Sequence, residues 1–268
     1  MTDYRKLFDL TGRKALVLGA ASGIGQASAE ALGGLGAEVH CADLDLPGAE
    51  STAAAIRDAG GKASASRADA ASGAEVAALV KRAQQELGRI DIGVTTPGIN
   101  IRKLVVNYSE ADFDRIVNLN FKGTFFFFQE VGRVMMAQGS GSIIASSSVR
   151  AWTIEPGLGV YGATKAAISL LVQGFAAEVG SHGVRVNAIA PSIIETPLVA
   201  PIKARPEIYN TYAKHTVIGR WGQPSEVGAA VAFLASDASS YISGSTMLID
   251  AGWTAIDGPP TGLTRTEA

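Results

Sequence analysis

Short apolar runs alternate along this chain with longer segments whose apolar residues recur at helical spacing. The runs predict β-strands at 14–18, 38–42, 63–68, 90–95, 142–146, 184–189 and 246–249. The longer segments predict helices at 24–35, 49–59, 73–87, 112–138, 160–179 and 225–234. Strict alternation of this kind is typical of parallel strands joined by right-handed crossovers. The pattern therefore predicts an α/β fold, a doubly wound, seven-stranded, mainly parallel sheet with helices on both faces.

Two stretches depart from the alternation. Residues 192–215 form a long, proline-rich segment, and an irregular insertion of this length is typically a lid or a binding loop. Residues 257–268 contain two prolines and are expected to form a frayed tail. Because no linker, repeat or change of composition divides the chain, residues 1–268 are predicted to form a single domain.

Composition narrows the possible partners. The chain has 268 residues, of which 47% are hydrophobic and 18% charged, so it can bury a core and is not disordered. A net charge of −2 without any basic run argues against a nucleic-acid partner. Cys41 is the only cysteine and the three histidines are far apart, so no disulfide and no metal site are expected. Without a signal peptide or a long apolar stretch, we expect a cytoplasmic protein with no membrane partner.

A glycine-rich turn follows the first predicted strand. The segment LGAASGIG places Gly19, Gly23 and Gly25 directly before the first helix. Glycines permit a tight turn and the close approach of a pyrophosphate, whose charge is stabilised by free N–H groups at a helix N-terminus. The position of this turn between a strand and a helix predicts that the chain binds a dinucleotide.

The end of the second strand suggests which dinucleotide. Asp43 lies 18 residues beyond Gly25, where a carboxylate can accept hydrogen bonds from an adenosine ribose and would repel a 2′-phosphate. Ser22 and Leu44 stand where a phosphate-binding basic residue could be, and neither is charged. NAD is therefore favoured over NADP. The alternative for Asp43 is an exposed residue at a strand end.

Tyr161 and Lys165 are spaced to lie one turn apart on one face of a helix. An ammonium group there can stabilise the phenolate and lower the pKa of the phenol from about 10. Such a tyrosine can exchange a proton with an alcohol or carbonyl oxygen near neutral pH. The pair alone is weak evidence, because tyrosine and lysine often have this spacing on solvated helices.

The wider set of motifs resembles the classical short-chain dehydrogenase/reductase family over residues 9–253. The match includes GAASGIG at 19–25, Asp69, Asn120, Gly123, Phe125, Ser148 thirteen residues before Tyr161, VRVNAIAPS at 184–192, ETP at 195–197 and IDAG at 249–252. The resemblance implies a Rossmann-type fold and hydride transfer between a substrate carbon and nicotinamide, with no metal.

The resemblance also implies roles for single residues. Tyr161 would be the general acid/base, Lys165 would lower its pKa and bind the nicotinamide ribose, Ser148 would hydrogen-bond the substrate oxygen, and Asn120 would hold a relay water. The cofactor contacts would be Gly19, Ser22, Gly23, Ile24 and Gly25 at the pyrophosphate, Asp43 and Leu44 at the ribose, Asp69 and Ala70 at the adenine, Thr96, Pro97 and Gly98 after the fourth strand, and Ile194 and Thr196 at the nicotinamide side. The alternative for Asn120 is a local hydrogen bond within its helix.

The chain departs from the family pattern at several positions. Leu18 stands where the family commonly has threonine, and Thr95, Thr96, Pro97 and Gly98 replace Asn-Asn-Ala-Gly. A threonine hydroxyl reaches less far than an asparagine amide, and Pro97 removes a backbone donor. Ser192 and Ala251 replace usual glycines. Because the four catalytic positions match, an active enzyme is still expected.

The substrate is less well defined by the sequence. Arg150 and Trp152 follow Ser148, and a second wall would carry Asn100, Arg102 and Lys103. We hypothesise that Arg150 orients a small polar or anionic substrate such as a sugar, polyol, sugar acid or hydroxy acid. The favoured alternative pairs Arg150 with Glu155 or with another subunit. The other functions considered are an NADPH-dependent 3-oxoacyl-thioester reductase and a dinucleotide-binding redox regulator without catalysis.

Phe125 to Phe128 are four consecutive aromatic residues in one predicted helix. At 100° per residue they span most of the helix circumference, so one face cannot hold them all. Burial within the subunit and packing against another subunit are both open, and we favour the second. The family resemblance implies a homotetramer, built on the helices that contain Phe125–Phe128 and Tyr161–Lys165.

Overall fold

The computed structural model describes residues 2–199 and 205–255. Its strands form one sheet in the order β3-β2-β1-β4-β5-β6-β7, and every pairing is parallel. The strands are β1 Lys14–Leu18, β2 Glu38–Asp43, β3 Lys62–Arg67, β4 Ile92–Thr95, β5 Gly141–Ser146, β6 Val184–Pro191 and β7 Thr246–Ile249. The prediction of a doubly wound α/β fold is confirmed, and its strand bounds differ from those observed by two residues or fewer.

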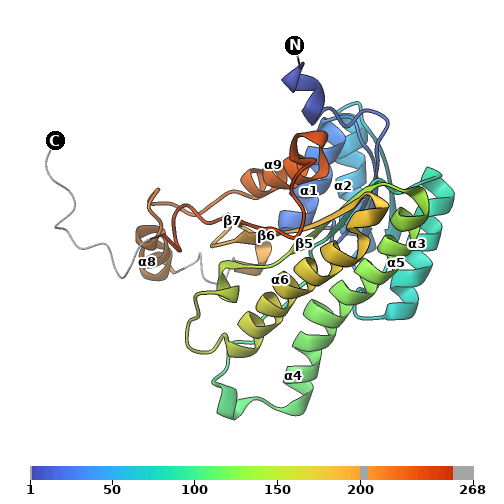
Figure 1. Cartoon of the computed structure of the whole chain (residues 1–268). Coiled ribbons are helices and arrows are strands. Elements are labelled where there is room, and N and C mark those ends of the chain that lie inside the picture. The colour runs from blue at the N-terminus through green and yellow to red at the C-terminus, as the bar shows by residue number, and fades with distance from the viewer. Residues whose placement is uncertain (1, 200–204, 256–268) are drawn as a thin grey trace, which may run out of the picture.

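Helices cover both faces of the sheet (Figure 1). They are α1 Gly23–Gly34, α2 Leu46–Asp58, α3 Gly73–Leu87, α4 Glu110–Ile116, α5 Gly123–Gln138, α6 Gly159–Val179, α8 Pro206–His215 and α9 Pro224–Ala235. One apolar cluster, which includes Phe127 and Val131, lies between the sheet and α3, α5 and α6. The other, which includes Leu32 and Val227, lies between the sheet and α1, α2 and α9. Burial on both faces is why the strands are runs of apolar residues.

The predicted helix at 112–138 contains an interruption that the sequence did not indicate. It begins earlier, at Glu110, because Ser109 and Asp112 form a capping box. A π-helical stretch, Val117–Lys122, then joins α4 to α5, and the N–H of Gly123 donates to the carbonyl of Asn118, five residues back. π-Helical turns inside α-helices are found frequently at functional sites.

The four phenylalanines of α5 divide between the inside and the outside of the subunit. Phe127 and Phe128 are buried in the core, whereas 41% of Phe125 is exposed. Phe126 is partly buried and lies against the start of α3, where a Cβ on Gly73 would come within 2.9 Å of its ring. The subunit core therefore accounts for part of this aromatic run and leaves Phe125 uncovered.

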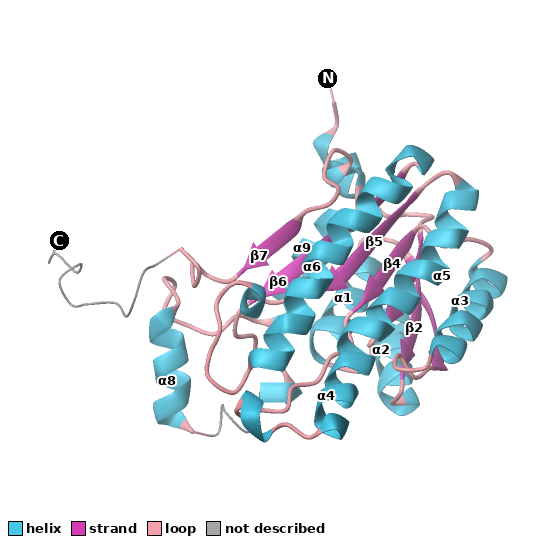
Figure 2. Cartoon of the chain, turned by 60° about the horizontal axis from the view of Figure 1, so that its bottom comes forward, coloured by secondary structure: helices cyan, strands magenta, loops and turns pink. Residues whose placement is uncertain are grey.

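The segment at 192–215 is not irregular throughout, which corrects the sequence prediction. Its last part is the helix α8, which lies outside the two helical layers (Figure 2). Pro206 stands at the helix start, where a missing N–H costs nothing, and Lys214 and His215 stand in the last turn. The prolines that suggested a loop thus include a helix-starting signal. The predicted tail at 257–268 lies outside the described residues.

Candidate active site

The glycine-rich turn connects β1 to α1 at the carboxyl edge of the sheet. Gly19 and Gly23 have φ angles of +94° and +58°, a conformation that side chains disfavour. A Cβ on Gly25 would lie 1.9 Å from the carbonyl oxygen of Gly19, so only glycine fits there. Ser22 is the N-cap of α1, and its side chain makes no capping hydrogen bond. The turn thus presents the N-terminus of α1 to a ligand, as an anion site requires.

A hollow of about 330 Å³ opens beside this turn. Its lining includes most of the residues that the sequence predicts to bind the cofactor: Gly19, Ser22, Gly23, Ile24, Gly25, Asp43, Leu44, Asp69, Ala70, Thr96, Pro97, Gly98 and Thr196. Ile194 and Tyr161 line the neighbouring pocket instead, and Lys165 lines neither. A glycine-walled hollow at a helix N-terminus, with a carboxylate at one end, fits a dinucleotide.

Asp43 is fixed in place by backbone amides at the end of β2. Its Oδ2 accepts from the N–H of Ala21 at 3.0 Å and its Oδ1 from the N–H of Asp45 at 3.0 Å. Leu44, beside it, is 56% exposed. The carboxylate is therefore held at the rim of the hollow with lone pairs left for further donors, since each oxygen can accept more than one bond.

Thr96 closes the back of the glycine-rich turn. Its hydroxyl is 3.3 Å from the carbonyl oxygens of both Leu18 and Gly19. A Cβ on Gly19 would lie 2.4 Å from that hydroxyl and 3.0 Å from Pro97. At the position where the family pattern has asparagine, the shorter threonine side chain thus packs directly against the turn.

Ser148 and Tyr161 meet at the carboxyl end of β5. Ser148 follows the strand and lies beside the phenol of Tyr161, which stands in the first turn of α6, while the Ser148 hydroxyl donates to the carbonyl oxygen of Pro191 at 3.4 Å. The same hydroxyl accepts from the N–H of Arg150 at 3.2 Å. Two groups able to hold one substrate oxygen therefore lie side by side.

Lys165 is one helical turn beyond Tyr161 and is buried. Its Nζ donates to the carbonyl oxygen of Ser146 at 2.7 Å and lies 5.7 Å from the centre of the Tyr161 ring. Burial lowers the pKa of Lys165 to about 8.

The pKa of Tyr161 differs from the sequence prediction. Burial raises the pKa of the phenol, although the neighbouring Ser148 hydroxyl and the charge of Arg150 act to lower it. In this structure desolvation outweighs the neighbouring positive charge.

Asn120 lies in the π-helical stretch and is fully buried. Its side-chain amide both accepts from the N–H of Ile99 at 2.8 Å and donates to the carbonyl of Ile99 at 3.0 Å. The amide also lies 3.3 Å from the hydroxyl of Thr164 on α6. The side chain thus binds outside its own helix, which contradicts the alternative of a purely local hydrogen bond. A Cβ on Gly98 would lie 3.4 Å from Lys165 Nζ and 3.5 Å from Asn120 Oδ1, so these three residues are neighbours.

A second pocket, of about 230 Å³, contains Ser148 and Tyr161. We call it the substrate pocket. Ile24 and Thr196 belong to this pocket and to the glycine-walled hollow, so the two adjoin. Asn100, Arg102 and Arg150 line it as the sequence suggested, whereas Lys103 pairs with Asp112.

Trp152, predicted as a substrate contact, is not part of this lining. It is 54% exposed and caps the end of the 3₁₀ turn Val149–Ala151. Tyr212 and Trp253, which the sequence did not indicate, do line the pocket. Tyr212 is on α8, within the segment 192–215 that was predicted to be a lid or binding loop. The sequence did not show that this part of the segment is a helix with Tyr212 at the pocket.

The favoured alternative for Arg150, a pair with Glu155, is present in the structure. The two side chains form a close ion pair, and only 12% of the Arg150 side chain is exposed. The guanidinium also lies over the ring of Trp253, 5.0 Å from its centre. Glu155 further accepts from Arg102 at 3.1 Å and from the hydroxyl of Tyr212 at 2.7 Å.

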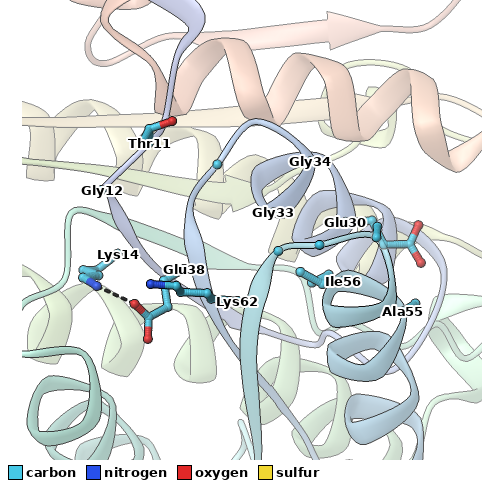
Figure 3. A pocket seen from close by; sticks show the side chains of 14 residues that line it. Thr11, Gly12, Lys14, Glu30, Gly33, Gly34, Glu38, Ala55, Ile56 and Lys62 are labelled. Carbon is cyan, nitrogen blue, oxygen red and sulfur yellow. Dashed lines mark hydrogen bonds and ion pairs between the residues drawn. The ribbon is translucent and has the colours of Figure 1, made fainter.

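A larger hollow, of about 740 Å³, lies at the opposite ends of the strands, where β1, β2 and β3 begin. Figure 3 shows the residues that line it. Lys14, Glu38 and Lys62 begin β1, β2 and β3 there, and Lys14 and Glu38 form an ion pair of 2.5 Å. None of the predicted site residues lines it. Because parallel strands carry ligands at their carboxyl ends, the glycine-walled hollow and the substrate pocket are the candidate site.

Known proteins resemble this chain over most of its length. A family model described as enoyl-(acyl carrier protein) reductase matches residues 19–254. The short-chain reductase protein NovJ of Streptomyces niveus is 39% identical over 243 residues, which cover 89% of this chain and 92% of that protein. This chain belongs to the short-chain dehydrogenase/reductase family.

Two further relatives of this short-chain dehydrogenase/reductase are gluconate 5-dehydrogenases. That of Gluconobacter oxydans (strain 621H) is 35% identical over 248 residues, covering 92% of this chain and 97% of the relative. The crystal structure of one from Burkholderia cenocepacia J2315, in complex with NADP and tartrate, superposes with a TM-score of 0.90 at 34% identity and covers 94% of this chain and 99% of that one. The chain is thus an oxidoreductase that acts on CH–OH groups.

Proposed function

We propose that this enzyme is an NAD(H)-dependent oxidoreductase that interconverts a secondary alcohol and a ketone on a small polar substrate such as a sugar, polyol or hydroxy acid. The observation that carries the proposal is the shared wall of Ile24 and Thr196 between the substrate pocket and the glycine-walled hollow. A substrate carbon held at Ser148 and Tyr161 would lie next to a dinucleotide bound at the turn. Proximity of this kind is what direct hydride transfer requires.

The residues would divide the chemistry as follows. Ser148 holds the substrate hydroxyl, Tyr161 takes its proton, and the carbon loses a hydride, which leaves the ketone. Bound NAD supplies the acceptor for that hydride and, as NADH, the donor in the reverse direction. Lys165 stabilises the phenolate and holds the nicotinamide ribose. Asn120, in the π-helical stretch, holds the water through which the proton leaves.

The preference for NAD rests on Asp43 and Leu44. A fixed carboxylate at the ribose end of the hollow would repel a 2′-phosphate, and Leu44 offers no compensating charge. Similar solved structures contain NADP in three cases and NADH in another, so the choice depends on these residues and not on the family.

The test is a parallel fluorescence titration with NADH and NADPH of the wild type and of Asp43→Ala. We expect tighter NADH binding in the wild type and a loss of most of that preference in the variant. A wild type that prefers NADPH would contradict the assignment and would favour the 3-oxoacyl-thioester reductase instead.

Tyr161→Phe should keep NADH binding and lose 10²- to 10⁴-fold in kcat, roughly the contribution of a general acid/base. Undiminished function in that variant would favour the non-catalytic regulator.

We further propose that residues 1–268 act as one domain, that the enzyme is a cytoplasmic homotetramer, and that nucleic acids and membranes are not its partners. Within residues 2–199 and 205–255, no helix is long and apolar enough to cross a membrane. The assembly is tested below.

A further inference from the structure

The charged side chains that line the substrate pocket all have the same sign. Among the described residues of the lining, the charged ones are Arg102 and Arg150. They come from different segments, the loop after β4 and the turn after β5. Two guanidinium groups at one small pocket repel each other unless an anion lies between them.

Glu155 is the anion that the chain itself supplies. Its Oε2 accepts from both terminal nitrogens of Arg102, at 3.1 and 3.2 Å, and from the hydroxyl of Tyr212 at 2.7 Å. Its Oε1 accepts from Arg150. A single carboxylate is therefore surrounded by donors from three segments, and one of the two positive charges has no carboxylate of its own.

The two arginines differ in how freely they can meet a ligand. Arg150 is clamped between Glu155 and the ring of Trp253, and 12% of its side chain is exposed. The Arg102 side chain is 46% exposed. The backbone N–H of Arg150 donates to the Ser148 hydroxyl, and the charge of its side chain acts on the phenol of Tyr161. The exposed guanidinium of Arg102 is thus suited to contact a ligand, and the buried guanidinium of Arg150 is suited to position that ligand.

We propose that Arg102 and Arg150 form a carboxylate subsite, with Arg102 contacting the ligand, and that Glu155 is a resident counter-ion that sets the subsite to one net positive charge. Resting on the proposed function, this assigns the substrate class: a small hydroxy monocarboxylate that reaches Ser148 and Tyr161 with a secondary hydroxyl. A planar guanidinium binds a carboxylate through paired hydrogen bonds, which gives both charge and orientation. The sequence led us to expect that Arg150 anchors the anion. In this proposal Arg150 is the positioning residue, and Arg102 contacts the anion.

The test compares acids with neutral analogues of the same chain length. Dissociation constants of glycerate and gluconate, against glycerol and sorbitol, are measured calorimetrically on the wild type with NADH present. We expect at least one acid to bind at least tenfold more tightly than its neutral analogue. Arg102→Gln should remove that advantage without changing the weaker binding of the neutral analogue. Glu155→Gln should increase it severalfold, because the counter-ion charge is gone while its hydrogen-bonding shape remains.

Arg133→Gln is the matched control, since it removes a surface arginine that pairs with Glu130 on α5, away from the pocket. It should leave all four constants unchanged. Equal binding of acids and neutral analogues, or equal losses in Arg102→Gln and Arg133→Gln, would overturn the proposal. A fall in acid affinity in Glu155→Gln would show that Glu155 only supports the pocket structure, and would also overturn it.

The binding measurement needs no turnover, so the two proposals fail separately. Preferential acid binding without any oxidation or reduction would leave the subsite standing and refute the proposed function. Turnover of a neutral alcohol that Arg102→Gln does not affect would leave the proposed function standing and refute the subsite.

Discussion

Single atoms decide which substitutions the glycine-rich turn tolerates. A Cβ on Gly25 would lie 1.9 Å from the carbonyl of Gly19, whereas a Cβ on Gly34, in the same helix, would meet nothing within 4 Å. We expect Gly25→Ala to abolish detectable NADH binding in a fluorescence titration. Gly34→Ala should bind NADH normally and, as alanine favours helix, gain up to about 1 kcal/mol in stability. Normal NADH affinity in Gly25→Ala would refute the placement of the cofactor.

Lys165 predicts a pH-dependent stability at the same scale. Its pKa is about 8 in the folded protein, below the ordinary value of 10.5. Between these values the unfolded chain binds a proton that the folded chain does not, so the free energy of unfolding rises with pH. The free energy of unfolding of the wild type, relative to that of Lys165→Met, should rise by about 2 kcal/mol from pH 7 to pH 9.5, measured by urea unfolding. A difference independent of pH would contradict the buried position of the ammonium.

At the scale of elements, one buried histidine joins two strands and a helix. His40 on β2 is within 2.8 Å of the hydroxyls of Ser64 and Ser66 on β3, and within 3.0 Å of Glu86 on α3. Burial lowers the pKa of His40 although Glu86 acts to raise it. The ring is thus part of the packing between these elements in its neutral form.

This histidine should make the fold less stable in acid. Below pH 6.5 the unfolded chain binds a proton that buried His40 does not, so stability falls as pH decreases, by up to about 1.4 kcal/mol per pH unit. His40→Gln keeps groups that can bond both serines and does not titrate. We expect a shallower decline of the unfolding midpoint between pH 6.5 and 5 in that variant, measured by circular dichroism. An identical decline in both proteins would argue against His40 as the cause.

At the scale of the whole molecule, α5 and α6 expose apolar side chains that the subunit does not cover. Phe125 is 41% exposed and Leu170 is 69% exposed. These helices are the ones through which the family resemblance implies assembly. A charge placed there should be costly only if another subunit packs on this face.

We therefore expect Leu170→Glu to reduce the size of the assembly in analytical ultracentrifugation. Tyr4→Glu, at a side chain 71% exposed near the N-terminus, adds the same charge at matched exposure and should leave the assembly unchanged. A wild type that sediments as a monomer, or a Leu170→Glu variant that sediments as the wild type does, would count against assembly through this face.

Much of the architecture could be predicted from the sequence because its signals are local. Strands buried on both faces must be apolar runs, and the alternation with helices then requires parallel pairing, as observed. The glycine spacing and the order of Ser148, Tyr161 and Lys165 were sufficient to indicate the family and the edge of the sheet that carries the site. The sequence did not indicate helix α8 because the prolines of the segment 192–215 resemble loop signals until Pro206 is placed at a helix start.

The tertiary structure decided what depends on residues distant in sequence. Arg150 lies five residues from Glu155, and the sequence already favoured that pair, whereas Arg102 and Tyr212 lie 53 and 57 residues away, so no local pattern could show that one carboxylate is shared between two arginines. The pKa of Tyr161 likewise follows from burial, which the spacing to Lys165 does not reveal. Sequence by itself determined the fold and the family, because these are set by periodicity and motif order. Charge balance and exposure at the pocket were decided only by packing, since desolvation and ion pairing depend on which segments meet in space.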